Sequence, residues 1–151
     1  MVVDTSVLAR TLQPHHALYP VADRALEILL KAGRELVVFP QILVELWVVA
    51  TRPPAANGLG MKPAQVSTDL SRLRDMLVLL PESPAIYPAW ETLVVSHEVV
   101  GKSAHDARIV AAMQVHGIRE ILTFDRTGFS RYCGVSVLFS FEVVANPLES
   151  N

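Results

Sequence analysis

The chain has 151 residues, of which 51% are hydrophobic and 19% charged, so it can bury one core and is too apolar for general disorder. Its formal net charge of −2 argues against binding nucleic acid through overall charge, and contact with RNA would need a local basic patch or a metal ion. We expect one domain over residues 1–151, without a signal peptide or a bilayer-spanning segment. Because Cys133 has no second cysteine to pair with, a reducing, cytoplasmic environment fits the sequence.

In the first half of the chain, short apolar runs alternate with stretches whose apolar residues recur at helical spacing. Gly33 is suited to end the first of these helices, because glycine readily adopts the left-handed conformation. A proline is accepted in a first turn, so Pro40 can begin the second helix, and the two prolines after Arg52 end it. In chain order we predict strand 1–4, helix 14–31, strand 35–39, helix 40–51 and loop 52–63.

The second half of the chain continues this alternation. Gly101 and Gly117 each follow a stretch of helical periodicity and mark its end. Strands that alternate with helices favour a parallel sheet covered on both faces. We therefore predict an α/β fold, a three-layer α/β/α domain with a central parallel sheet. Its remaining parts are helix 64–77, strand 78–80, helices 87–100 and 103–116, strands 120–124 and 135–139, and a tail over 140–151 with one helical turn.

Two aspartates directly follow predicted strands. Asp4 ends the first strand, and Asp125 follows the strand 120–124. In open parallel sheets ligands bind beyond the carboxyl ends of the strands, so both side chains should lie at the same edge of the sheet. Each aspartate also has a structural alternative, because an aspartate after a strand is a good N-cap for the next helix.

Two further acidic residues lie on predicted helices. Glu45 is flanked by apolar residues, and no residue at helical spacing from it is cationic. An ionised carboxylate in such surroundings costs on the order of several kcal/mol unless it is paired or binds a metal. The alternative is that Glu45 lies at the polar margin of its helix and contacts water. Asp106 lies three residues after Ser103, where it also fits a capping-box position.

Together, these four carboxylates predict a cation site. Carboxylates at about 4 Å repel one another by roughly 4 kcal/mol per pair at a surface-like dielectric, so such a cluster needs a positive charge. Oxygen ligands suit Mg²⁺, with Mn²⁺ as the alternative. The scattered histidines and the lone cysteine do not have the spacing of a zinc site. The predicted magnesium ligands are Asp4, Glu45, Asp106 and Asp125.

The segments around these acids resemble the PIN-domain family. Residues 1–8 resemble its opening, a strand that ends in an aspartate followed by two hydroxyl residues, and 44–46 resemble its second acidic position. Residues 103–112 and 122–129 resemble the third and fourth positions. The chain length and the proline-rich loop 52–63 resemble VapC toxins of toxin–antitoxin pairs. Many family members carry a further aspartate where this chain has Gly128, which leaves four acids rather than five.

The resemblance implies Mg²⁺-dependent hydrolysis of RNA phosphodiester bonds, with the four carboxylates as catalytic, metal-binding residues. A bound cation would generate hydroxide, so no side-chain nucleophile is required. Ser6 and Thr123 resemble hydroxyls that orient a carboxylate or the scissile phosphate. The candidates for a basic patch that contacts RNA are Arg10, Arg52, Lys102 and Arg126.

The resemblance also implies protein partners. A cognate antitoxin would lay a helix along the chain and place a basic side chain at the carboxylates, with Trp47 either forming a groove wall or packing in the core. We expect a homodimer that uses the loop around Leu59 and Met61 and the helix 64–77, unless these residues only close the core.

Two other functions compete with this reading. A PIN-like module could bind RNA or protein without cutting it, and cleavage that stops on adding a chelator would exclude this. A haloacid-type phosphatase needs a second aspartate two residues after the first, where this chain has Ser6.

Overall fold

The centre of the molecule is a five-stranded sheet with the order β3-β2-β1-β4-β5, in which every neighbouring pair is parallel. The computed structural model describes residues 1–146. The predicted α/β fold with a parallel sheet is confirmed. The strands are β1 (Val2–Val3), β2 (Val37–Val38), β3 (Val78–Leu79), β4 (Glu120–Thr123) and β5 (Ser136–Phe139).

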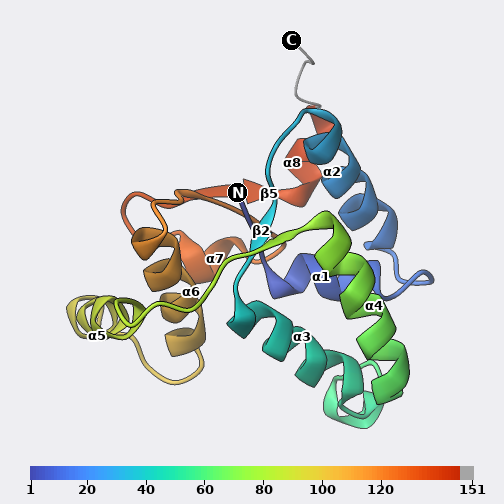
Figure 1. Cartoon of the computed structure of the whole chain (residues 1–151), viewed down its shortest axis with the longest axis horizontal. Coiled ribbons are helices and arrows are strands. Elements are labelled where there is room, and N and C mark those ends of the chain that lie inside the picture. Colours follow the sequence, from blue (N-terminus) through green and yellow to red (C-terminus); the bar gives the residue numbers. More distant parts are fainter. Residues whose placement is uncertain (147–151) are drawn as a thin grey trace.

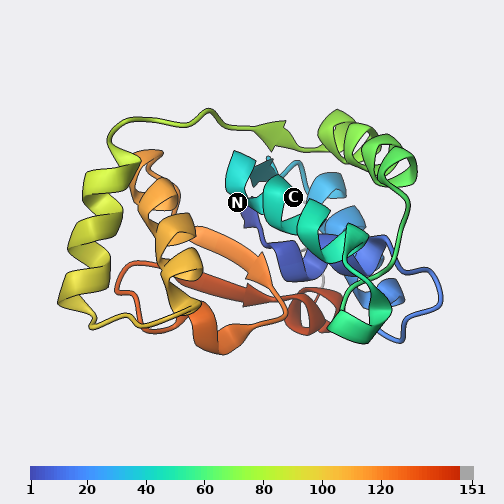
Figure 2. The ribbon, with the colours of Figure 1, turned by 90° about the horizontal axis from the view of Figure 1, so that it is seen from below.

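Helices cover the sheet on both sides and make the three layers that the sequence predicts (Figures 1 and 2). On one side, α1 packs against α2 and α3, α3 against α4, and α2 against α8; on the other, α6 packs against α5 and α7. The first group is α1 (Thr5–Thr11), α2 (Tyr19–Lys31), α3 (Pro40–Thr51), α4 (Pro63–Met76) and α8 (Ser140–Ala145); the second is α5 (Ile86–Ser96), α6 (Ser103–Val115) and α7 (Arg126–Phe129).

The three inner strands are buried on both faces. Apart from Glu120 and Thr123 at the two ends of β4, their residues are apolar without alternation, as expected for parallel strands covered by helices on both sides. The edge strand β3 differs, because Val78 and Leu79 are both exposed. Among the described residues, no helix is both long enough and apolar enough to cross a membrane.

Some predicted boundaries are wrong. The helix predicted from residue 14 begins at Tyr19, because residues 13–18 form successive turns. The helix predicted to reach residue 100 ends at Ser96, since Glu98 adopts a left-handed φ of 48°. The helices α1 and α7 were not predicted. Of the tail predicted over 140–151, residues 140–145 form α8, and residues 147–151 lie outside the described part of the chain.

Candidate metal centre

Asp4 is held at the carboxyl end of β1 by two hydroxyls. Its Oδ2 atom accepts hydrogen bonds from Ser6 Oγ at 2.6 Å and from Thr123 Oγ1 at 2.7 Å. The backbone N–H of Ser6 also donates to Oδ2, so Asp4 caps α1 as well. Asp4 is only 7% exposed, and Thr123 is fully buried. Within residues 1–146 every hydrogen bond to this carboxylate reaches Oδ2, which leaves Oδ1 available for a cation.

Glu45 extends from α3 toward the residue after Asp4. Its Oε2 accepts a hydrogen bond from Thr5 Oγ1 at 3.1 Å, and its Oε1 accepts one from Gln41 Nε2 at 2.6 Å. His105 Nδ1 lies 3.6 Å from Oε1. The expectation of purely apolar surroundings is therefore wrong: the side chain is 29% exposed and lies at the polar margin of its helix. Glu45 nevertheless lies on the same side of the sheet as Asp4.

Asp125 follows β4 and caps α7. Its Oδ1 accepts hydrogen bonds from Thr127 Oγ1 at 2.7 Å and from the backbone N–H groups of Thr127 and Gly128 at 3.0 and 3.3 Å. The hydroxyl bond from Thr127, followed by the two backbone bonds, lowers the pKa of Asp125 against the opposing effect of burial. These bonds to Oδ1 favour the ionised carboxylate. Asp125 therefore caps α7 through Oδ1, as the structural alternative predicts, while Oδ2 is left for a cation.

Asp106 lies in the first turn of α6, within the electrostatic reach of the other three acids. Its pKa is raised from 3.8 to about 6, first by burial and then by the charges of Asp4, Asp125 and Glu45, in that order, against a small opposing effect of His105. Each of the other three carboxylates thus lies near enough to disfavour ionisation of Asp106. Among the described residues that line the cleft over these acids, Lys102 is the one with a permanent positive charge.

Gly128 allows Asp106 and Asp125 to approach each other. A Cβ atom on Gly128 would lie 3.0 Å from Asp106 Oδ2 and 3.4 Å from Asp125 Oδ2. A side chain at this position would require the carboxylate of Asp106 to move by a few tenths of an ångström. A glycine therefore allows the close approach of these two candidate ligands.

An open cleft of about 490 Å³ lies over Glu45, Asp106 and Asp125, and Asp4 is not among its lining residues. Within residues 1–146, no three Asp, Glu, His or Cys side chains converge closely enough to form a ready-made metal-ligand set. Oxygen donors and uncompensated negative charge fit a hard divalent cation. The cleft is lined by Thr5, Val44, Glu45, Val48, Val49, Lys102, His105, Asp106 and Asp125.

The predicted basic residues occupy different places. Lys102 lines the cleft itself. Arg126 forms an ion pair with Glu142, and its guanidinium carbon lies 4.9 Å from the centre of the Phe139 ring. Arg10 and Arg52 line a neighbouring pocket instead of the cleft. The four basic residues therefore do not form one patch.

Several residues that contact the carboxylates were not singled out in the sequence. Gln41 lies one helical turn before Glu45, and its own Oε1 accepts a hydrogen bond from Arg108 at 2.8 Å. Thr127 follows Asp125 at a spacing typical of an N-cap, which is a signal that sequence reasoning could have used. His105 precedes Asp106, but its approach to Glu45 depends on the packing of α6 against the sheet and has no sequence signal.

The raised pKa of Asp106 predicts a distinctive pH dependence in metal-free protein. Between pH 3.8 and about 6 the folded chain binds a proton at Asp106 more tightly than the unfolded chain does. The tighter binding of this proton stabilises the folded chain. The stabilisation is complete below pH 3.8 and is lost as the pH rises through about 6. Urea unfolding in EDTA should therefore show wild type losing stability relative to Asp106→Asn across this range. Parallel pH profiles for the two proteins would contradict the assignment.

Solved structures share the fold of this chain at low sequence identity. A chain of the VapBC2 complex from Rickettsia felis, bound to a DNA fragment from its promoter, has a TM-score of 0.71 and 15% identity, covering 91% of this chain and 96% of the other. VapC20 from Mycobacterium tuberculosis, a toxin that cleaves the sarcin–ricin loop, has a TM-score of 0.63 and 22% identity, with coverages of 86% and 93%. A toxin–antitoxin complex from Klebsiella pneumoniae has a TM-score of 0.61 and 18% identity, with coverages of 89% and 94%.

Comparison with curated proteins finds no match to this chain. The family model that describes the PIN domain, in contrast, matches residues 1–135. This segment contains all four carboxylates and the elements that carry or precede them, which are β1, α3, α6 and β4. Because the match spans most of the 151 residues, the chain belongs to the PIN-domain family.

Proposed function

We propose that this chain is a Mg²⁺-dependent endoribonuclease that acts in the cytoplasm as the toxin of a type II toxin–antitoxin pair. The observation that carries the proposal is a cleft at the carboxyl edge of the sheet that is lined by Glu45, Asp106 and Asp125. Asp4 is tied to this edge through Thr123, whose hydroxyl donates to Asp4 Oδ2 and accepts from the backbone N–H of Asp125. The fold it shares with chains of VapBC complexes, and with a toxin that cleaves the sarcin–ricin loop, supports RNA as the substrate.

In this proposal the four carboxylates hold the cation, and their neighbours fix them in place. Ser6 and Thr123 orient Asp4, while Thr5 and Gln41 orient Glu45. A divalent cation, when bound, lowers the pKa of water toward neutrality and neutralises charge on the phosphate. Mn²⁺ is an acceptable substitute because it takes the same oxygen ligands.

Cleavage of RNA that depends on the metal tests the proposal. Purified chain should convert total bacterial RNA to discrete fragments in Mg²⁺, should stop on adding EDTA, and should resume when excess Mg²⁺ is restored. A PIN-domain module that only binds its partner would give no fragments under any of these conditions. Cleavage that continues unchanged in EDTA would overturn the metal-dependent mechanism.

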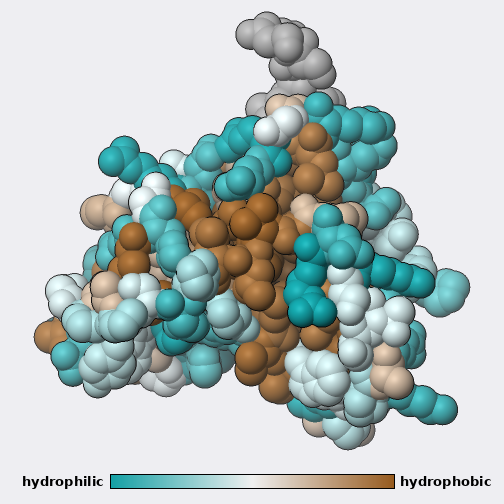
Figure 3. Space-filling view, viewed as in Figure 1, coloured by the Kyte–Doolittle hydropathy of each residue, from teal (hydrophilic) through white to brown (hydrophobic). Residues whose placement is uncertain are grey.

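We further propose a cognate antitoxin as the protein partner. The exposed side of α3 next to the carboxylates is apolar, with Val44 63%, Val48 50% and Trp47 36% exposed. Figure 3 shows a hydrophobic band across this face, over α3 and β3. Val44 and Val48 also line the cleft, so an apolar helix laid along α3 would bring a basic side chain to the carboxylates. Trp47 is partly exposed, as a groove wall requires, and is not plain core.

Competition with metal tests this partner. An arginine can hold two carboxylate oxygens at once, so the antitoxin should inhibit less as Mg²⁺ rises. Its affinity should fall for Asp106→Asn, which removes one of the carboxylates. Equal binding to wild type and Asp106→Asn, without any dependence on Mg²⁺, would show that the antitoxin acts elsewhere.

The homodimer also remains a proposal. Leu59 and Met61 are only half-buried, whereas Val66 and Leu73 of α4 are buried in the chain itself. Exposed apolar side chains lie instead at the end of α4 and along β3. Light scattering at tens of micromolar should give twice the mass of the chain, and a clean monomer would remove the hypothesis.

A further inference from the structure

A second pocket, of about 520 Å³, adjoins the carboxylate cleft. We propose that this arginine pocket binds a backbone phosphate of the RNA strand, next in line to the phosphate that is hydrolysed. This inference rests on the proposed function, and it specifies where the RNA strand runs beside the carboxylates. The pocket is lined mainly by α1, the turn after it, and the loop that follows α3, and its polar side chains are Thr5, Ser6, Arg10, Gln13, His16, Arg52 and Asn57.

The charge of the pocket suits an anion. Two arginines line it, and no aspartate or glutamate does. The hydrogen-bond partners of both guanidinium groups are neutral: Arg10 donates to Gln13 Oε1 at 2.6 Å, and Arg52 donates to the backbone carbonyl oxygen of Asn57 at 3.0 Å. Within residues 1–146 neither guanidinium lies within 4 Å of a carboxylate. In a chain of net charge −2, two uncompensated arginines at one pocket provide the local positive charge that RNA binding requires.

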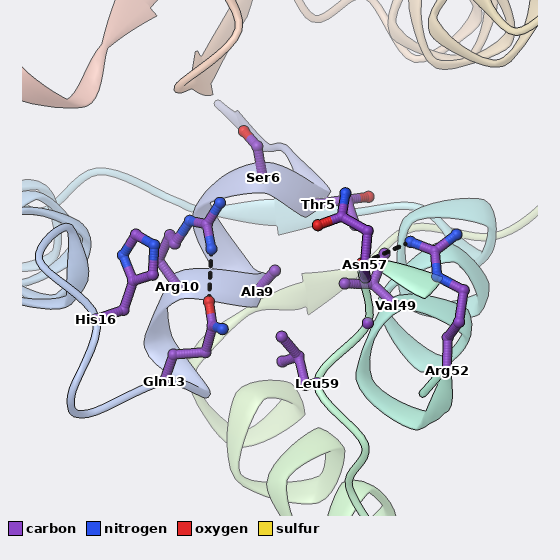
Figure 4. Close-up of a pocket in the computed structure, with 11 residues that line it drawn as sticks. Thr5, Ser6, Ala9, Arg10, Gln13, His16, Val49, Arg52, Asn57 and Leu59 are labelled. Carbon is purple, nitrogen blue, oxygen red and sulfur yellow. Dashed lines mark hydrogen bonds between the residues drawn. The ribbon is translucent and has the colours of Figure 1, made fainter. Parts of the chain in front are cut away.

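The side chains are arranged to hold a phosphate from two sides. Figure 4 shows Arg10 and His16 on one side of the pocket and Arg52 with Asn57 on the other, with Ala9 and Leu59 between them. The Nε atom of Arg52 is buried and has no hydrogen-bond partner within the described chain. His16 Nδ1 accepts a hydrogen bond from the backbone N–H of Leu18 at 3.0 Å, so the neutral ring carries its proton on Nε2 as a donor.

The position of the pocket relates it to the cleft. Thr5 and Val49 line both, and Thr5 Oγ1 donates a hydrogen bond to Glu45. A strand whose one phosphate lies at the carboxylates can therefore place a neighbouring phosphate among the arginines. Without metal the carboxylates repel RNA, so attraction has to come from a separate basic site of this kind. Arg126 differs from these two arginines, because its guanidinium is already paired with the carboxylate of Glu142.

Salt-dependent binding of RNA tests the pocket without requiring cleavage. Anisotropy of a labelled single-stranded RNA would be titrated in EDTA with wild type, Arg10→Gln, Arg52→Gln and the double variant. Each lost phosphate contact should reduce the slope of log affinity against log salt by about 0.7. The double variant should bind about tenfold more weakly or worse. Arg74→Gln is the matched control, because Arg74 is exposed on α4 and also has only a neutral partner, Ser71.

Two further variants separate binding from folding. Arg52 contacts the backbone of Asn57 in the loop after α3, so Arg52→Gln also removes a contact that supports the pocket. Arg52→Lys keeps the positive charge and should keep the slope of log affinity against log salt. Arg10→Gln changes only a contact with Gln13 and should reduce the slope by itself with an unchanged melting temperature. If Arg10→Gln and the double variant keep the slope of wild type, the proposal is wrong.

A modified RNA locates the phosphate. Once the cleaved bond of a model RNA is mapped, one neighbouring phosphate is replaced by a neutral methylphosphonate. The replacement should raise KM about tenfold for wild type, with kcat nearly unchanged, and should have little further effect on the double variant. If the methylphosphonate raises KM equally for wild type and for the double variant at every neighbouring position, the proposal is wrong. It is also wrong if the arginine variants lose binding to the antitoxin but keep binding to RNA. If wild type cleaves no RNA in Mg²⁺, the proposed function fails, whereas the salt slopes still report on the pocket.

Discussion

Replacing Asp106 by asparagine should reduce Mg²⁺-dependent RNA cleavage by at least about 100-fold, because loss of a partner that only orients a ligand already costs about 10- to 100-fold. The same change should not destabilise metal-free protein above about pH 6, since it removes one of four mutually repelling charges. Single-turnover cleavage and urea unfolding in EDTA measure the two effects.

The control for this substitution is Asp75→Asn, which alters an exposed aspartate on α4. It should leave cleavage and stability unchanged. Wild type should also gain about 2.7 kcal/mol at a Mg²⁺ concentration about 100 times its Kd, a gain that Asp106→Asn should not show at the same concentration. Retained cleavage by Asp106→Asn would remove this residue from the site.

Thr123→Val should reduce cleavage by about 10- to 100-fold, although the side chain keeps its shape and the residue is fully buried. Its hydroxyl donates to Asp4 Oδ2 at 2.7 Å and accepts from the backbone N–H of Asp125 at 2.9 Å, so it links two of the proposed ligands. Leaving the N–H unpaired should also cost about 1–3 kcal/mol of stability.

Raising Mg²⁺ should recover part of the activity of Thr123→Val, because the metal affinity is reduced while all four carboxylates remain. The matched control is Thr92→Val on α5, whose hydroxyl donates to the carbonyl oxygen of Pro88 in the same helix. Thr92→Val should cleave RNA as wild type does. Equal losses in the two variants would show that Thr123 has no particular role at Asp4.

The sequence predicted the parts of the fold that depend on long apolar runs. The bounds of α3 agree with the prediction because Pro40 begins it and the prolines after Arg52 end it. The short helices α1 and α7 have seven and four residues, too few for periodicity to be visible. Each begins instead at a capping aspartate, Asp4 for α1 and Asp125 for α7. Within residues 1–146 each aspartate caps its helix through one carboxylate oxygen and leaves the other without a hydrogen bond.

The candidate site was predictable at the level of residue type and not at the level of contacts. Strand ends and family spacing placed the four acids at one edge of the sheet. Whether an arginine is paired depends on residues far away in sequence, and only the fold shows that Glu142 pairs with Arg126 while Arg10 and Arg52 have neutral partners. The polar surroundings of Glu45 were missed for the same reason, because Thr5 reaches it from a different helix.

A crystal of this chain soaked in Mn²⁺ gives the most direct test of the central claim. The anomalous difference map should show a peak within about 2.5 Å of carboxylate oxygens of the cluster formed by Asp4, Glu45, Asp106 and Asp125. The peak should be absent from crystals of Asp106→Asn soaked in the same solution. No peak at these carboxylates, at a Mn²⁺ concentration that supports cleavage of RNA in solution, would contradict the account.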